Sequence, residues 1–349
     1  METILSTRDL AKQFHYPEKE AGLGGSIRSL LWPRTRTVDA VKGVTFQVES
    51  GELLAFIGPN GAGKSTMIKM LTGILHPTSG EARVLGFVPW QDRQALAYRI
   101  GAVFGQRSQL WVHLPARDSF RLLARIYEVP DDEYARRLQE LVELFDLGEI
   151  MGVPVRKLSL GQRMRCEIAA SLIHSPEVIF LDEPTIGLDV IAKEKIRELI
   201  LSANSQAGTT IFLTSHDAGD IEKLCRRVVI VDRGQILLDT TVQSLKRSDH
   251  FRVRTIGLRT DRAIEGFAMD GVEVLKQKGT GMKLRVDGSR VPVESVLQRL
   301  MELGRIEDIT VRAPSLEEII ARIYREKGLP EPPVAPEVTE QEAEEQEES

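Results

Sequence analysis

Residues 58–66 read Gly58-Pro59-Asn60-Gly61-Ala62-Gly63-Lys64-Ser65-Thr66. They follow the apolar run Leu53–Ile57 and precede Met67–Leu71, so the local order is predicted to be strand, glycine-rich turn, helix. In that context the pattern G-x-x-x-x-G-K-[ST] predicts a phosphate-binding P-loop. Backbone N–H groups and the helix N-terminus would face the phosphates. Lys64 is expected to reach the β- and γ-phosphates, and the Ser65 hydroxyl to hold Mg²⁺.

Length and composition suit one large and one small domain. The chain has 349 residues, 42% of them hydrophobic and 28% charged, as in an ordinary soluble globular protein. The net charge is −5, but residues 329–349 hold eight glutamates and no Lys or Arg, so the rest of the chain carries +3. This balance does not indicate a strongly basic nucleic-acid binder.

The two cysteines, Cys166 and Cys225, have no paired spacing, so neither a disulfide framework nor a metal site is indicated, and a reduced, intracellular protein is expected. The start Met1-Glu2-Thr3 is acidic, which argues against a signal peptide. No apolar run approaches the roughly 20 residues that span a bilayer. If the protein works at a membrane, another chain is expected to supply the spanning part.

The first part of the chain, up to about residue 246, is predicted to be an α/β core with a mostly parallel sheet. Apolar strands are expected at 99–106, 178–181, 209–213 and 228–231, with helices at 190–207 and near 220–225 between them. An antiparallel β part is expected before the P-loop, interrupted by an insertion at 16–37. A helical subdomain is expected at about 88–175, with segments 117–129 and 131–147 separated by Pro130.

The insertion contains a basic, partly apolar piece, Ile27–Arg34. Two interpretations stay open: a surface loop packed on its own domain, or an amphipathic element that touches a membrane or a membrane partner.

The second part, residues 250–327, is predicted to be a small α+β domain. Strands are expected at 250–258, 272–276, 282–286 and 306–311, and helices at Asp261–Ala268, Val293–Leu303 and Ser315–Lys327. This β-α-β-β-α-β order is the ferredoxin-like, split βαβ pattern. Residues 329–349, with four prolines and eight glutamates, are expected to form a disordered acidic tail.

Two carboxylates, Asp182 and Glu183, follow the apolar strand 178–181. Ligands bind at this end of the strands in an open α/β sheet. Beside a P-loop, Asp182 suits Mg²⁺, and Glu183 suits the orientation or deprotonation of an attacking water. In 158–162, Ser159 and Gly161 precede a helix expected to begin near Arg163, which predicts a second anion site. Two such devices suggest a head-to-tail dimer with shared sites.

These motifs together resemble the ATP-binding cassette (ABC) ATPases. Residues 58–65, Gln106, 158–162, 180–184, 187–189 and 214–216 are similar to the Walker A, Q-loop, signature, Walker B, D-loop and H-loop motifs, in family order. The similarity covers about residues 3–244. The signature and D-loop variants, the insertion and the C-terminal extension most resemble the subgroup that pairs with ABC-2 type permeases, many of them bacterial exporters.

The resemblance implies a role for each matching residue. Gln106 would touch Mg²⁺ and the lytic water, and His216 would contact the γ-phosphate. Asp189 would couple the two sites of a homodimer, and Ser159 and Gly161 would bind the γ-phosphate in trans. The implied catalytic residues are Glu183, His216 and Gln106, and the implied metal ligands are Ser65, Gln106 and Asp182. The ATP-binding set is Phe14, Gly58, Pro59, Asn60, Gly61, Ala62, Gly63, Lys64, Ser65, Thr66, Ser159, Gly161, Gln162 and Asp189.

Two departures from the family pattern concern the signature and the adenine site. Leu160 stands where the commonest signature has Gly, so the close approach of that turn is less free. The adenine-stacking aromatic is expected to be Phe14 or Tyr16, and a core role for Phe14 stays open.

The resemblance implies an ATPase subunit on the cytoplasmic side of the inner membrane that drives a separate permease, without nucleic acid. The alternative is a soluble ABC ATPase acting on ribosomes or DNA. Against it, the chain has one P-loop and one signature, and no long coiled-coil or zinc insertion. Import instead of export would rest on the same motifs, and the C-terminal domain is expected to support dimerisation or regulation.

Overall fold

The computed structural model describes residues 2–17, 35–105, 108–215, 217–247 and 252–326. The chain divides into two compact units, one up to Val242 and one from Gln243 onward. The basic piece at 27–34, Gln106, His216 and the acidic tail lie outside the described residues. Among the described helices, none combines the length and apolar character that crossing a membrane requires.

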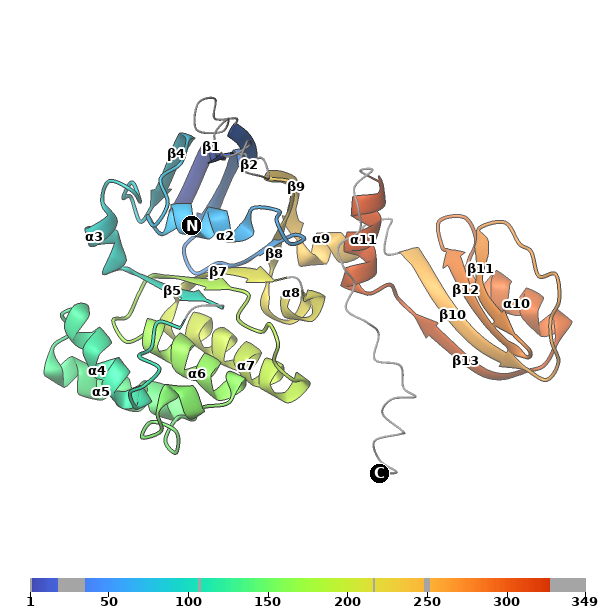
Figure 1. The fold of residues 1–349 in the computed structure, drawn as a ribbon. Helices are drawn as coiled ribbons and strands as arrows, with labels where there is room; N and C mark the ends of the chain where they lie inside the picture. The colour runs from blue at the N-terminus through green and yellow to red at the C-terminus, as the bar shows by residue number, and fades with distance from the viewer. Residues whose placement is uncertain (1, 18–34, 106–107, 216, 248–251, 327–349) are drawn as a thin grey trace, which may run out of the picture. The chain divides into compact units, whose positions relative to one another are not determined.

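The first unit is organised around a six-stranded sheet, of which β5, β7, β8 and β9 are labelled in Figure 1. Its order is β5-β6-β7-β3-β8-β9, parallel throughout except for the antiparallel edge strand β9. The predicted parallel α/β core is therefore confirmed. The strands are β3 (Leu53–Ile57), β5 (Ile100–Phe104), β6 (Val178–Asp182), β7 (Thr210–Ser215), β8 (Arg227–Asp232) and β9 (Gln235–Thr241).

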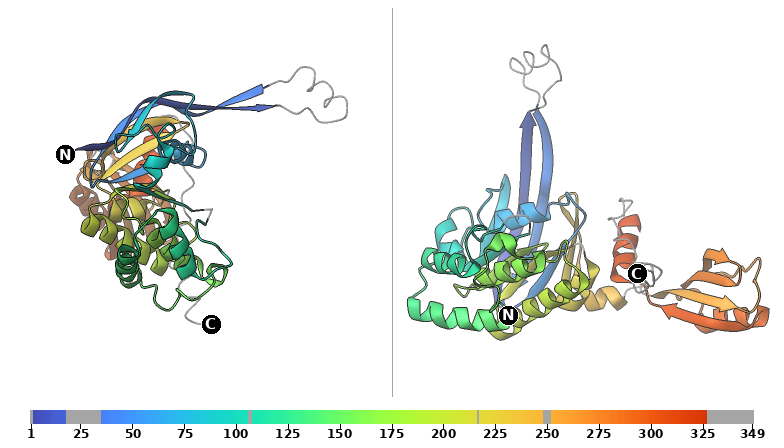
Figure 2. Two further views of the ribbon diagram at one scale, coloured as in Figure 1. Left: turned by 90° about the vertical axis from the view of Figure 1, so that its left-hand side faces the viewer. Right: turned by 60° about the horizontal axis from the view of Figure 1, so that its bottom comes forward.

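A three-stranded antiparallel sheet of order β2-β1-β4 forms the second layer. It consists of β1 (Thr3–Pro17), β2 (Thr35–Glu49) and β4 (Ser79–Val84). The pairing of β1 with β2 continues as far as Pro17 opposite Thr35. Figure 2 shows these two strands extending as a ribbon beyond the rest of the unit.

The main core lies between the two sheets, where α2 (Lys64–Leu71) is also buried. Phe212 of β7 is at its centre, with ring-centroid distances of 5.3 Å to Phe56 of β3, 5.6 Å to Phe180 of β6 and 6.1 Å to Phe46 of β2. Tilted aromatic packing of this kind adds to the free energy gained by burial alone. These rings therefore fix the strands whose ends carry the P-loop and the acidic pair.

The other helices of this unit largely match the sequence prediction. Two predicted helical segments correspond to α4 and α5, with Pro130 as the N-cap of α5. The predicted start of α6 near Arg163 was late, because Ser159 caps the helix and its first turn begins at Leu160. The bounds are α3 (Arg93–Ala97), α4 (Ala116–Ile126), α5 (Asp131–Leu144), the 3₁₀ helix η1 (Val155–Lys157), α6 (Leu160–Ser171), α7 (Val190–Ala207) and α8 (Ala218–Leu224).

The second unit contains a four-stranded antiparallel sheet of order β11-β12-β10-β13. Its core packs between α10 and one face of this sheet. The elements are α9 (Val242–Arg247), β10 (Val253–Thr260), β11 (Val272–Lys278), β12 (Gly281–Asp287), α10 (Val293–Leu303), β13 (Ile306–Arg312) and α11 (Leu316–Glu326).

The helix predicted at Asp261–Ala268 was wrong. This segment is irregular, although Ile264 and Phe267 are buried in the core as a helix face would be. Asp261 is held to the end of α10, where its N–H donates to the Arg305 carbonyl and its Oδ1 accepts from the Arg305 N–H, both at 2.9 Å. Gly266 has φ +67°, a left-handed conformation that interrupts a helix.

A buried ionic network ties the ends of β6 and β7 to helices α7 and α8. Asp220 is fully buried, and its Oδ1 lies 2.7 Å from Arg197 Nη2. Its Oδ2 accepts hydrogen bonds from Thr185 Oγ1 at 2.5 Å and from Ser215 Oγ at 2.8 Å. One carboxylate therefore holds the loops that follow both strands.

We expect Arg197→Met to lower the free energy of unfolding by about 3–5 kcal/mol, because it leaves the buried Asp220 carboxylate without its cation. The matched control is Lys223→Met, which removes an exposed ammonium that pairs with Glu194 and should change stability little. Urea denaturation followed by circular dichroism measures both. Equal losses for the two variants would contradict a special role for the buried pair.

Candidate functional site

A cavity of about 640 Å³ lies at the carboxyl ends of β3 and β6. The strand between them, β7, sets their separation, so the P-loop after β3 meets the acidic pair after β6. The lining includes most of the predicted P-loop residues together with the aromatic candidates. It comprises Phe14, Tyr16, Val38, Ala40, Asn60, Gly61, Gly63, Lys64, Ser65, Thr66, Lys69, Ile74, Phe104, Gly105, Asp182, Glu183 and Ile186.

Lys64 lines this cavity, and only 5% of its side chain is exposed. Its Nζ donates to the carbonyls of Gly58 at 2.8 Å and Pro59 at 3.3 Å, and it lies 3.3 Å from Glu183 Oε1. The P-loop carbonyls and one carboxylate therefore hold the ammonium in place. A phosphate entering the cavity would meet a cation that is already positioned.

Thr214 connects the two carboxylates of the site. Its hydroxyl donates to Asp182 Oδ1 at 2.6 Å and accepts from the Glu183 N–H at 3.1 Å. The same Glu183 N–H also lies 3.1 Å from the Thr214 carbonyl oxygen. Glu183 has φ +54°, which is uncommon for a non-glycine residue and is held here by these bonds. The strand end thus orients both acids toward the cavity.

The P-loop glycines make room for the backbone turn itself. A Cβ on Gly58 would lie 2.2 Å from the Val231 carbonyl oxygen, and one on Gly63 would lie 2.4 Å from that of Ala40. Gly63 also has φ +103°, a conformation that L side chains rarely adopt. A Cβ on Gly61 would meet no atom within 4 Å, but the φ of +82° there is one that L side chains rarely adopt. The P-loop turn therefore requires glycine at positions 58 and 63.

Both aromatic candidates line the same cavity. The Phe14 and Tyr16 rings lie 6.2 Å apart on β1, and Lys12 Nζ lies 5.4 Å from the Phe14 centroid. Tyr16 is 53% exposed, whereas Phe14 is partly covered. Each ring offers the cavity a planar surface for stacking with a base.

Gln106 lies outside the described residues, but its neighbours are firmly held. The Gly105 N–H donates to the Asp182 carbonyl at 3.0 Å, and a Cβ at Gly105 would meet that oxygen at 2.8 Å. On the other side, Ser108 and Gln109 donate to the buried Glu167 carboxylate on α6. Burial raises the pKa of Glu167 from its ordinary value. Gly105 is thus bonded to β6, and Ser108 and Gln109 are bonded to the signature helix.

The signature residues do not line this cavity in the described part of the chain. Ser159 is the N-cap of α6 and forms a capping box with Gln162, since each side chain accepts the other residue's N–H, at 3.2 and 2.9 Å. Leu160 reaches over Gly187, where an added Cβ would lie 3.3 Å from Leu160 Cδ2. The departure at Leu160 is accommodated by that glycine, and the exposed Ser159 remains at the helix N-terminus.

Asp189 caps the next helix, and its Oδ1 accepts from the Ala192 N–H at 2.8 Å. Directly after it, Val190 and Ile191 are 76% and 84% exposed. Leu160 and Ile186 beside them are also exposed, at 39% and 37%. The signature and D-loop segments therefore share an apolar surface of the kind that marks a protein contact. His216 lies outside the described residues.

The donor set at the cavity fits Mg²⁺ bound with a nucleotide. Within the described ranges, no group of three or more His, Cys, Asp or Glu side chains is arranged to hold a metal ion. The cavity does contain Asp182 and Ser65 beside the P-loop. Mg²⁺ commonly binds one or two carboxylates together with substrate phosphates, which is what these residues offer.

Sequence reasoning missed the residues that position the site. Thr214 belongs to the motif at 214–216, but no local pattern distinguishes Asp220, Arg197 or Glu167. All of them act through contacts between elements far apart in the sequence. Their polar type within otherwise buried segments was the one signal available, since buried polar side chains usually have a defined partner.

Known proteins with similar sequences belong to one family. The sequence profile of the ABC transporter family matches residues 41–186. The daunorubicin resistance ATP-binding protein DrrA3 of Streptomyces coeruleorubidus is 32% identical over 81% of this chain and 90% of that protein. The bacitracin transport ATP-binding protein BcrA of Bacillus licheniformis is 32% identical over 71% of this chain and 72% of its own.

A solved structure of the ATP-binding cassette MJ0796, a dimer in a post-hydrolysis state bound to ADP and Pi, is also similar. It matches with a TM-score of 0.57 and 25% identity, over 68% of this chain and 98% of that chain. The P-loop, the acidic pair at the end of β6 and these relatives all indicate an ATP-binding cassette. The chain belongs to the ATP-binding subunits of ABC transporters and is an ATPase.

Proposed function

We propose that the chain energises a separate ABC-2 type permease for export, through ATP-driven dimerisation of two copies on the cytoplasmic side of the inner membrane. The observation that carries the proposal is the separation of Ser159 and Gly161 from the cavity that holds Lys64 and Glu183. A second copy can supply the missing γ-phosphate contacts. The printed names of relatives in drug and antibiotic resistance support export.

The reaction is transfer of the γ-phosphoryl group to water. Glu183 accepts the water proton as the oxygen–phosphorus bond forms and the β–γ bridging bond breaks, while Lys64 stabilises charge on the phosphate oxygens. Asp182 and Ser65 would hold Mg²⁺, which when bound neutralises charge on the β- and γ-phosphate oxygens. Through the two hydrogen bonds of its hydroxyl, Thr214 fixes the Asp182 side chain relative to the Glu183 backbone.

The exposed apolar surface around Asp189 supports the dimer. Val190 and Ile191 are the most exposed of the large apolar side chains in the described part of the chain. The next residue, Ala192, packs close to Gly161 of the signature helix, where an added Cβ would lie 3.1 Å from the Ala192 Cβ. A second exposed apolar group, formed by Trp111, Val112, Leu114, Leu122 and Ile126, lies before and on α4. We assign the first surface to the dimer contact and the second to the permease.

A soluble ABC ATPase acting on ribosomes or DNA is the rival function. The names of the relatives refer to resistance and transport, which does not favour it. Import in place of export uses the same site and would be separated by transport assays.

We expect Glu183→Gln to bind ATP, to lose roughly 10²–10⁴-fold in turnover, and to accumulate as a dimer with Mg²⁺ and ATP, because the general base is lost while the binding groups remain. Phosphate release and light scattering measure the two effects. Turnover near that of the wild type would refute the role assigned to Glu183.

In the Glu183→Gln protein, the further substitution Ile191→Asp should weaken ATP-dependent dimerisation by roughly tenfold or more, because an unpaired charge enters the apolar contact. The substitution lies in the first turn of α7, where an acidic residue suits the helix dipole, so folding should be unaffected. The control is Ile126→Asp, an equally drastic change on α4 that should dimerise normally. If the two variants dimerise alike, the assignment of this surface is wrong.

The proposed permease partner is tested by purifying the tagged wild-type chain from detergent-solubilised membranes of its own organism. We expect a multispanning membrane protein to accompany it, identified by mass spectrometry, and Ile126→Asp to lose this protein while Ile191→Asp retains it. Recovery of ribosomes or DNA in place of a membrane protein would favour the rival.

A further inference from the structure

The sheet of the second unit has one covered and one open face. Met282, Leu284 and Val286 of β12 are buried, and they pack with Val296 and Leu300 of α10. Because side chains alternate along a strand, the intervening residues of β12 point to the opposite face. The strand register extends this assignment to the neighbouring strands.

The open face is basic. It carries exposed cationic side chains from all four strands, while its acidic residues number three: Glu273, Asp287 and Asp308. The exposed cations are Arg259 of β10, Lys276 and Lys278 of β11, Lys283 of β12 and Arg312 of β13. Arg285, also on this face, is paired with Glu273 at 2.9 Å.

Lys276 and Lys283 are direct cross-strand neighbours on this face. Like charges placed directly opposite one another destabilise a sheet. Within the described residues, neither lysine forms an ion pair, and the same holds for Lys278. An anion bound between these strands would relieve the repulsion.

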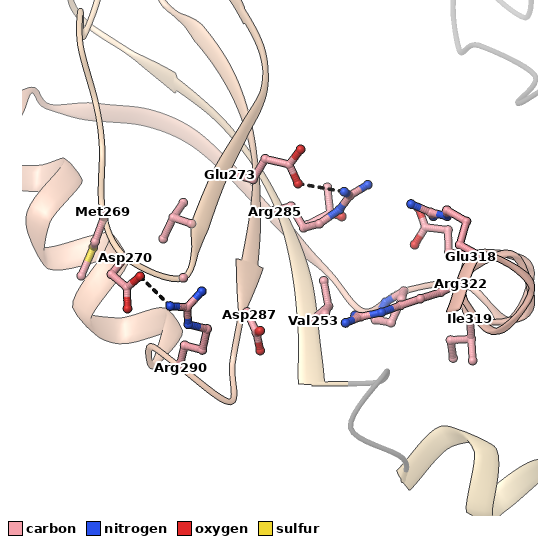
Figure 3. A pocket seen from close by; sticks show the side chains of 15 residues that line it. Val253, Met269, Asp270, Glu273, Arg285, Asp287, Arg290, Glu318, Ile319 and Arg322 are labelled. Atoms are coloured by element: carbon pink, nitrogen blue, oxygen red, sulfur yellow. Dashed lines mark hydrogen bonds and ion pairs between the residues drawn. The ribbon is translucent and has the colours of Figure 1, made fainter. Parts of the chain in front are cut away.

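A cavity of about 730 Å³ continues the open face at one end, between the sheet and α11. Figure 3 shows Arg285 and Arg290 beside their acidic partners on the sheet side, with Arg322 reaching in from α11. The partner of Arg290 is Asp270, at 2.8 Å. Helix α11 ends at Glu326, and Arg325 in its last turn lines this cavity.

The chain that follows α11 contains the acidic tail, residues 329–349, with eight glutamates and no Lys or Arg. Extended, residues 327–349 reach about 75 Å, far more than the length of the strands that form the face. A tethered segment also has an effective concentration of about the millimolar level at a nearby surface.

We propose that the acidic tail binds the open basic face of its own C-terminal sheet, defined by Arg259, Lys276, Lys278, Lys283 and Arg312. The open-face positions of the four strands carry no aromatic side chain, so the stacking platform that single-stranded RNA binders use is absent from this described face. The interaction is electrostatic and must weaken with salt, since the screening length falls from about 8 Å at 0.15 M to about 3 Å at 1 M.

Zero-length carbodiimide cross-linking of the full chain, mapped by mass spectrometry, tests this directly. Tail glutamates should couple to Lys276, Lys278 and Lys283 in preference to the exposed Lys157 of the first unit, and the yield should fall roughly tenfold at 1 M salt. Mixing isotope-labelled and unlabelled chains should show the links within single chains. Links spread evenly over all exposed lysines, or links between chains, would overturn the proposal.

A charge exchange provides the matched control. Lys276→Glu, Lys278→Glu and Lys283→Glu together should abolish the links, and Glu342→Lys, Glu344→Lys and Glu345→Lys in the same chain should restore them with the partners reversed. Failure of this restoration in a folded protein would contradict the pairing. Binding of the wild-type chain to phosphatidylglycerol vesicles or RNA through the three lysines, with the tail uncoupled, would assign the face to another partner.

Discussion

The position of β7 between β3 and β6 is the constraint on which the nucleotide site depends. Because the strands are parallel, their carboxyl ends share one edge, and the P-loop and the acidic pair meet across a single intervening strand. Phe212 of β7 fixes this order from within the core through its contacts with the neighbouring phenylalanines. At the edge, Thr214 of the same strand bonds to Asp182 and Glu183. One strand thus supplies both the packing and the polar contacts that hold the site together.

The same strand end connects the site to the rest of the first unit. Ser215 and Thr185 share the buried carboxylate of Asp220, which Arg197 neutralises from α7. Since Asp189 is the N-cap of α7, this network joins the acidic strand end to the surface that we assign to the dimer contact. Glu167 makes the corresponding connection between the signature helix and the segment after Gln106. The Asp220 network therefore forms a short, buried connection between the surface around Asp189 and the acidic pair at the end of β6.

The local sequence was sufficient to predict those elements whose structure depends on neighbouring residues. The strand, turn and helix around Lys64, the strand before Asp182 and the 190–207 helix were all predicted from spacing and composition. The helix prediction failed at Asp261–Ala268. Gly266 and the hydrogen bonds between Asp261 and Arg305 hold this segment in an irregular conformation, and Arg305 lies far from it in the sequence. The sequence did not predict the roles of Thr214, Asp220 and Arg197, because these roles arise from strand order and helix packing. The predicted start of α6 was too late because its capping residue, Ser159, is itself part of the signature motif.

The central claim is that each catalytic site is shared between two copies, with Lys64 and Glu183 from one and Ser159 and Gly161 from the other. The most direct test is an experimental structure of the wild-type chain with Mg²⁺ and a non-hydrolysable ATP analogue. We expect a dimer in which the γ-phosphate beside Lys64 of one copy contacts the Ser159 hydroxyl and the Gly161 N–H of its partner. A nucleotide-loaded chain in which Ser159 and Gly161 face no neighbouring Lys64, in any assembly that forms, would contradict the account.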